Sequence, residues 1–132
     1  MKAPIECKIQ SGFWLYLALL FFLLPLPWLS AIFFAASVHE IGHIFALKIQ
    51  NKRIYSLTFG ICGARIVTQQ LSRRQEFFAA MAGPAAGFLL VLLFPWFPRI
   101  AFSALVQSLF NLLPIYPFDG GRVIRSIMRN TP

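Results

Sequence analysis

A long stretch without charge constrains the fold of this chain more than any other feature. No Asp, Glu, Lys, Arg or His occurs between Ile9 and Val38, and roughly 20 apolar residues in a row are enough to cross the hydrocarbon core of a bilayer. The rest of the chain agrees, because 58% of its 132 residues are hydrophobic and only 12% are charged. Soluble domains carry about 25% charged residues. We therefore predict a multi-pass protein of the cell membrane.

The apolar residues fall into four segments that we predict to cross or enter the membrane. Between the second and third, residues 54–67 are rich in β-branched and aromatic side chains and contain two glycines, which predicts a β-hairpin. Pro84, inside the third segment, is expected to kink or interrupt its helix. The expected fold class is an all-α membrane protein with about four transmembrane segments and one small membrane-associated β-hairpin. The segments are Phe13–Leu24, Trp28 to about Ile49, Phe77 to about Phe94, and Ile100 to about Leu113.

The distribution of basic residues predicts the orientation. A net charge of +8 can indicate nucleic-acid binding, but the Lys and Arg residues lie in short polar joints and do not form one patch, so we expect no nucleic-acid partner. With the N-terminus inside, only Arg99 among the basic groups falls outside, in agreement with the positive-inside rule. If Phe13–Leu24 only dips into the membrane, the N-terminus changes sides and the rest of the topology stands.

The second apolar segment contains both histidines of the chain, in the sequence HEIGH from His39 to His43. On a helix, residues four apart lie on the same face, so both imidazoles can bind one cation while Glu40 reaches a water beside it. Zinc hydrolases share this spacing; their metal lowers the pKa of water to about 7, and the glutamate accepts the proton. The pattern also arises by chance, and a structural salt bridge is an alternative. Ionisable residues in a membrane segment are nevertheless rare and functional by default.

A catalytic zinc needs a third protein ligand, with one position left open for water. The acidic residues are Glu6, Glu40, Glu76 and Asp119. Glu6 lies in the N-terminal tail, and Glu76 stands beside two arginines, where pairing or solvation explains it. Asp119 follows two prolines and precedes a glycine pair, which predicts broken helix, tolerated at membrane depth beside a water-filled cavity or inside protein. Asp119 is thus the candidate third ligand, with an N-cap of the basic tail helix as the alternative.

Two motifs together resemble the site-2 protease family of intramembrane zinc metalloproteases. One is HEIGH, and the other is NLLPIYPFDGG, from Asn111 to Gly121. The sequence AGP at Ala82–Pro84 is also similar to the family. The resemblance implies that residues 1–132 form a single transmembrane metalloprotease domain with a catalytic core at about 28–125. The short length is most similar to the bacterial branch related to the sporulation protease that processes a sigma-factor precursor.

The resemblance also implies roles for individual residues. His39, His43 and Asp119 would bind one zinc ion per chain, and Glu40 would be the general base. Asn111 would polarise the substrate or the transition state. The family hydrolyses peptide bonds in or near transmembrane segments of its substrates, which implies regulated intramembrane proteolysis with the active site toward the cytoplasmic side.

The resemblance predicts partners and leaves alternatives open. The expected partners are a membrane-embedded protein substrate and the lipid bilayer. The chain is short, with no room for a PDZ or CBS domain, and it has Gly87 where many relatives carry asparagine. Activity could therefore require a regulatory membrane partner or a homo-oligomer. The predicted hairpin could pair with an unwound substrate by strand addition or form a lid over the site.

The sequence leaves two other function classes open. One is a catalytically inactive membrane module that binds and regulates single-span proteins, although every chemical group that the reaction requires is present. The other is a metal-handling membrane protein, which would need several ionisable groups along a path, whereas the sequence contains one cluster.

Overall fold

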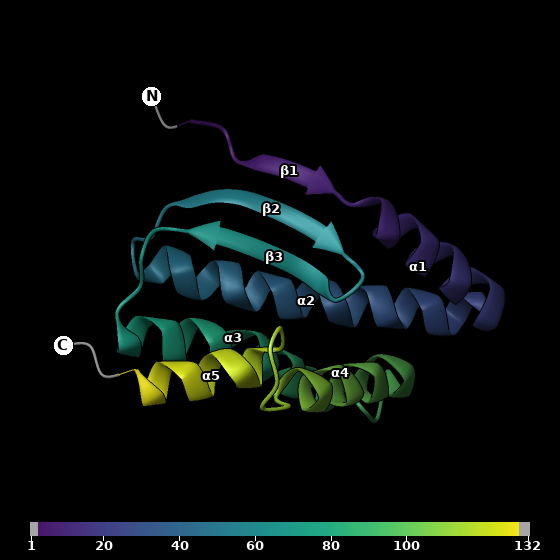
Figure 1. Ribbon diagram of the computed structural model, residues 1–132. Coiled ribbons are helices and arrows are strands. Elements are labelled where there is room, and N and C mark those ends of the chain that lie inside the picture. Colours follow the sequence, from purple (N-terminus) through teal and green to yellow (C-terminus); the bar gives the residue numbers. More distant parts are fainter. Residues whose placement is uncertain (1–2, 130–132) are drawn as a thin grey trace.

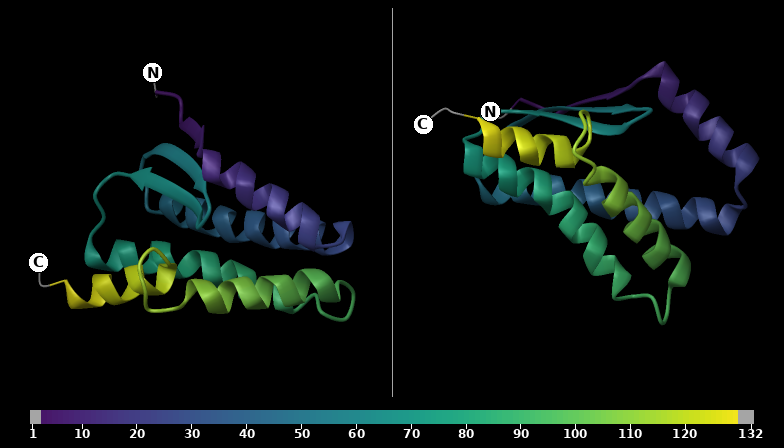
Figure 2. Two further views of the ribbon diagram at one scale, coloured as in Figure 1. Left: turned by 45° about the vertical axis from the view of Figure 1, so that its right-hand side comes forward. Right: turned by 60° about the horizontal axis from the view of Figure 1, so that its bottom comes forward.

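The computed structural model describes residues 3–129 as three layers: a sheet, a long helix, and three further helices (Figure 1). The sheet lies over α2, and α3, α4 and α5 lie on the opposite side of α2 in both Figure 1 and the left view of Figure 2. The elements in chain order are β1 (Glu6–Ile9), α1 (Ser11–Leu23), α2 (Leu26–Ile49), β2 (Ile54–Gly60), β3 (Gly63–Thr68), α3 (Arg73–Val91), α4 (Pro98–Asn111) and α5 (Asp119–Met128).

The central helix α2 buries one narrow face. It begins after Pro25, whose fixed φ suits the residue before a helix, and it packs against α3 and α4. Because residues four apart share a face, the two histidines lie on the packed side of α2 and face protein. Its buried residues are Leu29, Ala31, Ala35, His39, His43 and Leu47.

Small residues bring α2 and α3 close together. A Cβ added to Gly42 would lie 2.6 Å from the Ala82 carbonyl oxygen and 2.9 Å from the Ala86 Cβ, so the glycine of HEIGH is required for this contact. Such small-residue packing is typical of helices in membranes. Pro84 does not interrupt its helix, because α3 continues through it from Arg73 to Val91. That part of the expectation was wrong.

The predicted hairpin is confirmed as β2 and β3, which pair antiparallel. The sheet has a third strand that was not expected, since β1 pairs parallel with β2 and the strand order is β1-β2-β3. A four-residue strand that pairs with a partner some 50 positions later leaves no local signal in the sequence. Within residues 3–129, one edge of β3 therefore pairs with no other strand.

Each predicted membrane segment corresponds to a helix, but the helices differ in length. Within residues 3–129, only α2 is long and apolar enough to cross a bilayer by itself. The helices α1 and α4 have 13 and 14 residues, fewer than the roughly 20 that a full crossing needs. The fold is mostly helical with one apolar helix of membrane-spanning length, and four crossings stay a prediction.

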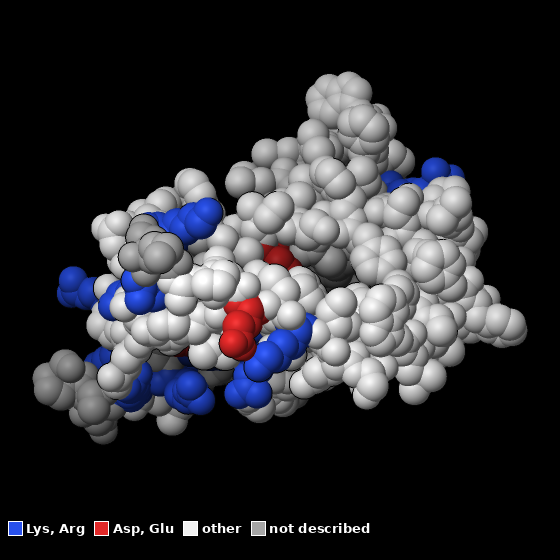
Figure 3. Space-filling model, turned by 90° about the horizontal axis from the view of Figure 1, so that it is seen from above, with Lys and Arg blue, Asp and Glu red and all other residues white. Residues whose placement is uncertain are grey.

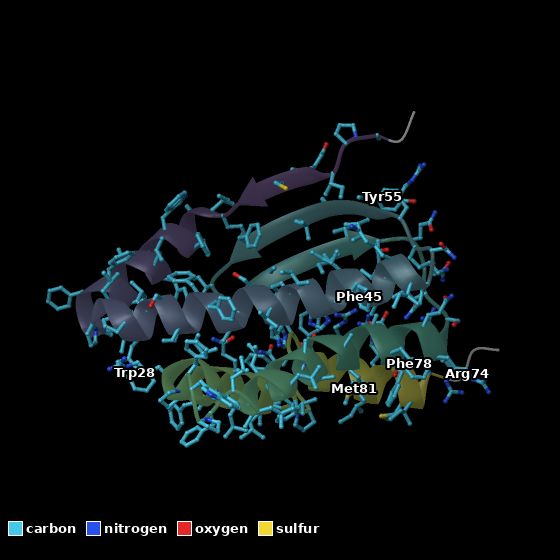
Figure 4. The ribbon with its side chains drawn as sticks, turned by 180° about the vertical axis from the view of Figure 1, so that it is seen from behind. Trp28, Phe45, Tyr55, Arg74, Phe78 and Met81 are labelled. Carbon is cyan, nitrogen blue, oxygen red and sulfur yellow. The ribbon has the colours of Figure 1, made fainter. Side chains whose placement is uncertain are left out.

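The surface exposes many large apolar side chains and carries most of its basic ones toward one end. Helix α1 buries no residue, and large apolar side chains such as Phe45 on α2 and Phe78 on α3 are exposed. Trp28 and Arg74 lie at opposite ends of the molecule in Figure 4. Figure 3, which shows the molecule from above, has most of its Lys and Arg side chains gathered toward one end. Basic residues gathered on one side are typical of chains that sit in a bilayer.

Candidate metal centre

Three side chains from two helices meet below the surface. His39 Nε2 lies 3.0 Å from Asp119 Oδ2, and His43 Nε2 lies 3.1 Å from the same oxygen and 3.2 Å from His39 Nε2. All three residues are buried. Ligands bound tetrahedrally at 2.0–2.1 Å from zinc stand roughly 3.3 Å apart. The triangle of donor atoms therefore has the size that a tetrahedral ion requires, and the two motifs predicted to meet do so.

The backbone of α3 determines the tautomer of His43. Its Nδ1 lies 2.7 Å from the Ala79 carbonyl oxygen, which can only accept a hydrogen bond, so Nδ1 carries a proton. In the neutral imidazole, Nε2 then presents a lone pair toward Asp119 Oδ2. Two acceptors in contact repel unless a metal ion lies between them or Nε2 carries a second proton. The donor set therefore fits a metal ion, and the Ala79 carbonyl orients His43 as second-layer acceptors orient metal-bound imidazoles.

A glycine of α3 makes room for the two imidazoles. A Cβ added to Gly83 would overlap His43 Nε2 and lie 2.8 Å from His39 Nε2. No other residue type fits at this position without displacing a histidine. In the sequence, Gly83 stands out only as the middle residue of AGP, and its contact with the site depends on how α3 packs on α2.

Asp119 is the first residue of α5. The alternative of a helix cap is wrong, because Phe118 occupies the N-cap position and no side chain caps the helix. The glycine pair that follows allows the preceding loop to pack closely: a Cβ on Gly120 would overlap the Leu112 carbonyl, and one on Gly121 would lie 2.8 Å from the Ile115 carbonyl. This packing turns the Asp119 side chain toward α2.

Glu40 lies next to the cluster but on the side of the sheet. It is partly buried, and a Cβ added to Gly63 at the start of β3 would lie 3.9 Å from its Oε1. Seen from above, the molecule has acidic atoms at the bottom of a hollow (Figure 3). Glu40 thus lies beside the start of β3 and next to the two histidines, where a general base is expected.

Two other acidic or polar residues have contacts that the sequence did not indicate. The sequence suggested that Glu76 pairs with the arginines beside it or is solvated; instead it pairs with Arg122 at 2.9 Å and its side chain is 18% exposed. Asn111 donates from Nδ2 to the Gln107 carbonyl oxygen at 2.8 Å, one turn earlier on α4. This contact does not test the predicted role of Asn111, which stays a prediction.

Curated proteins of similar sequence are named as zinc metalloproteases. No family model matches the chain. The zinc metalloprotease MJ0392 of Methanocaldococcus jannaschii is 28% identical over 133 residues, covering 90% of this chain and 36% of that protein. A Synechocystis protein named provisionally as a zinc metalloprotease is 31% identical over 124 residues, covering 77% of this chain and 33% of that protein. The chain therefore spans about a third of the length of these curated relatives.

The fold agrees with a solved structure. The site-2 protease from Methanocaldococcus jannaschii matches with a TM-score of 0.82 and 21% identity, covering 97% of this chain and 69% of that chain. The chain thus shares the fold of that site-2 protease and is similar in sequence to two proteins named as zinc metalloproteases.

Proposed function

We propose that this protein is an intramembrane zinc metalloprotease that hydrolyses peptide bonds in or near transmembrane segments of other proteins. The observation that carries the proposal is the buried triangle of His39 Nε2, His43 Nε2 and Asp119 Oδ2, with sides of 3.0, 3.1 and 3.2 Å, beside Glu40. The residues fit one zinc ion per chain with a fourth position open. Bound zinc would supply Lewis acidity, which lowers the pKa of water and polarises the scissile carbonyl.

Each side chain then has one task. His39, His43 and Asp119 hold the metal, and the protonated Nδ1 of His43 keeps its ring aligned through Ala79. Glu40 accepts a proton from the attacking water as the water oxygen bonds to the carbonyl carbon. It then gives that proton to the amine nitrogen as the C–N bond breaks. The role of Asn111, polarisation of the substrate or of the transition state, remains part of the proposal.

The open edge of β3 supports a way of presenting the substrate. A peptide bond within a helix is shielded by its own turn, so a transmembrane substrate must unwind before water reaches it. An unwound segment can pair with the free edge of β3, and Gly63 at the start of that strand adjoins Glu40. We therefore favour strand addition over a simple lid for this hairpin.

The proposal includes a membrane location with several crossings and a site toward the cytoplasm. Helix α2 is long enough to span, and both histidines lie in its second half, toward Lys48. Exposed apolar side chains surround the other helices, and they need lipid or further protein to cover them. Reaching substrates within the same bilayer requires this location.

Removal of the metal tests the proposal directly. Purified protein in detergent or liposomes is expected to cleave a single-span reporter, to lose that activity when a chelator removes zinc, and to regain it with added zinc but not magnesium, which prefers oxygen ligands. Gel analysis of the reporter measures cleavage. A protein that holds zinc yet leaves all such reporters intact would instead support the inactive binding module.

A further inference from the structure

Arg122 connects the candidate metal centre to a carboxylate that the proposed reaction does not use. Its Nε donates a 2.9 Å hydrogen bond to Glu76 Oε1, and its Nη1 lies 3.5 Å from Asp119 Oδ1. The other oxygen of Asp119, Oδ2, is the one that contacts both histidines. The guanidinium therefore faces the oxygen of Asp119 that points away from the imidazoles.

Burial makes this arrangement more effective than a surface ion pair. The side chains of Asp119, Glu76 and Arg122 are 9%, 18% and 31% exposed, so water screens their charges only in part. A guanidinium carries five N–H donors in a rigid plane and can hold two carboxylates in set directions, which a flexible ammonium cannot do. Arg122 is thus suited to fix the rotation of the Asp119 carboxylate.

Helix α3 supplies a second, separate attachment for α5. Arg73 donates from Nε to the Ser126 carbonyl oxygen at 3.0 Å and from Nη2 to the Ile127 carbonyl oxygen at 2.7 Å. These bonds hold the C-terminal end of α5, about two turns from Asp119. The two helices lie side by side in Figures 1 and 2. Docking of α5 and orientation of Asp119 can therefore be perturbed independently.

We propose that Arg122, held in place by Glu76, is a positioning residue that makes Asp119 a one-oxygen metal ligand. It keeps Oδ2 toward His39 and His43 and retains Oδ1 by a hydrogen bond, which leaves the fourth metal position free. This inference rests on the proposed zinc site. Neither Arg122 nor Glu76 is assigned a contact with the substrate.

Metal affinity and a spectroscopic signature test the proposal. In Arg122→Gln, zinc affinity measured by chelator competition is expected to fall about 10- to 100-fold. In the cobalt-substituted protein, the visible bands should weaken, because a released Oδ1 can join the metal and four-coordinate cobalt absorbs more strongly than five-coordinate cobalt. Adding Glu76→Gln to Arg122→Gln should cause no further loss, since Glu76 acts through Arg122.

Two arginine variants provide matched controls. Arg125→Gln removes the same charge from an exposed position on α5, and Arg73→Gln loosens the docking of α5 away from Asp119. Both are expected to retain the wild-type cobalt spectrum and a zinc affinity close to that of the wild type.

Three results would overturn the inference. A wild-type cobalt spectrum and zinc affinity in Arg122→Gln would refute the positioning role while the metal site stands. An equal loss of zinc in Arg73→Gln would show that Arg122 only docks the helix. A wild-type protein that binds neither metal would overturn the proposed function and this inference together.

Discussion

Glu40→Gln is expected to retain zinc and to lose cleavage. Glutamine keeps the size and much of the polarity of glutamate but cannot accept the proton of the attacking water. General-base catalysis contributes about 10²- to 10⁴-fold to a rate, so turnover of a single-span reporter should fall by that range. Zinc content should stay at the wild-type level, because Glu40 is not one of the three residues whose donor atoms converge.

Glu6→Gln provides the matched control for that variant. The variant makes the same chemical change at an exposed residue of β1. Within the described part of the chain, the Glu6 side chain forms an ion pair only with Lys8. The Glu6→Gln protein should therefore cleave like the wild type. Undiminished turnover in Glu40→Gln would remove the general base from the account, and a loss of zinc in that variant would mean that Glu40 is itself a ligand.

Gly83→Ala is expected to disrupt the metal centre, although alanine normally stabilises a helix relative to glycine by about 1 kcal/mol. The added methyl group would occupy the space of His43 Nε2 and come within 2.8 Å of His39 Nε2, so at least one imidazole must move. Overpacking of this kind costs about 1–3 kcal/mol, which corresponds to a loss of about 5- to 150-fold in zinc affinity. Chelator competition on the purified variant measures the loss.

Gly87→Ala separates crowding in general from crowding of the histidines. It lies one turn further along α3, and its Cβ would overlap Ser108 Oγ on α4, a hydroxyl that can rotate away. We expect this variant to keep wild-type zinc affinity. If Gly83→Ala also kept it, the histidines would have room that the structure does not provide, and the role assigned to Gly83 would be wrong.

Local patterns account for the part of the site that could be predicted. The pairing of His39 with His43 follows from helical periodicity alone, and the helix itself follows from an apolar run that starts after a proline. Asp119 was reached because so few acidic residues exist, and because prolines and glycines around it indicate a broken helix. The hairpin was predicted from β-branched residues punctuated by glycine. These signals all lie within a few residues of the feature that they predict.

The parts that were missed depend on contacts between distant segments. The Ala79 carbonyl and the space at Gly83 become part of the site only when α3 packs on α2, and nothing in their neighbours along the chain indicates this. Glu76 has two arginines close by in sequence, yet on the folded chain it faces Arg122, 46 positions away. The strand β1 likewise exists only because β2 offers it an edge.

The zinc content of purified wild-type protein, compared with that of Asp119→Ala, tests the central claim most directly. Elemental analysis should find about one zinc per chain in the wild type. X-ray absorption should show two imidazole nitrogens and at least one oxygen ligand at about 2.0–2.2 Å from the zinc. The Asp119→Ala protein, folded but lacking one of three ligands, should retain little zinc. Equal zinc in both proteins, or none in the wild type, would contradict the account.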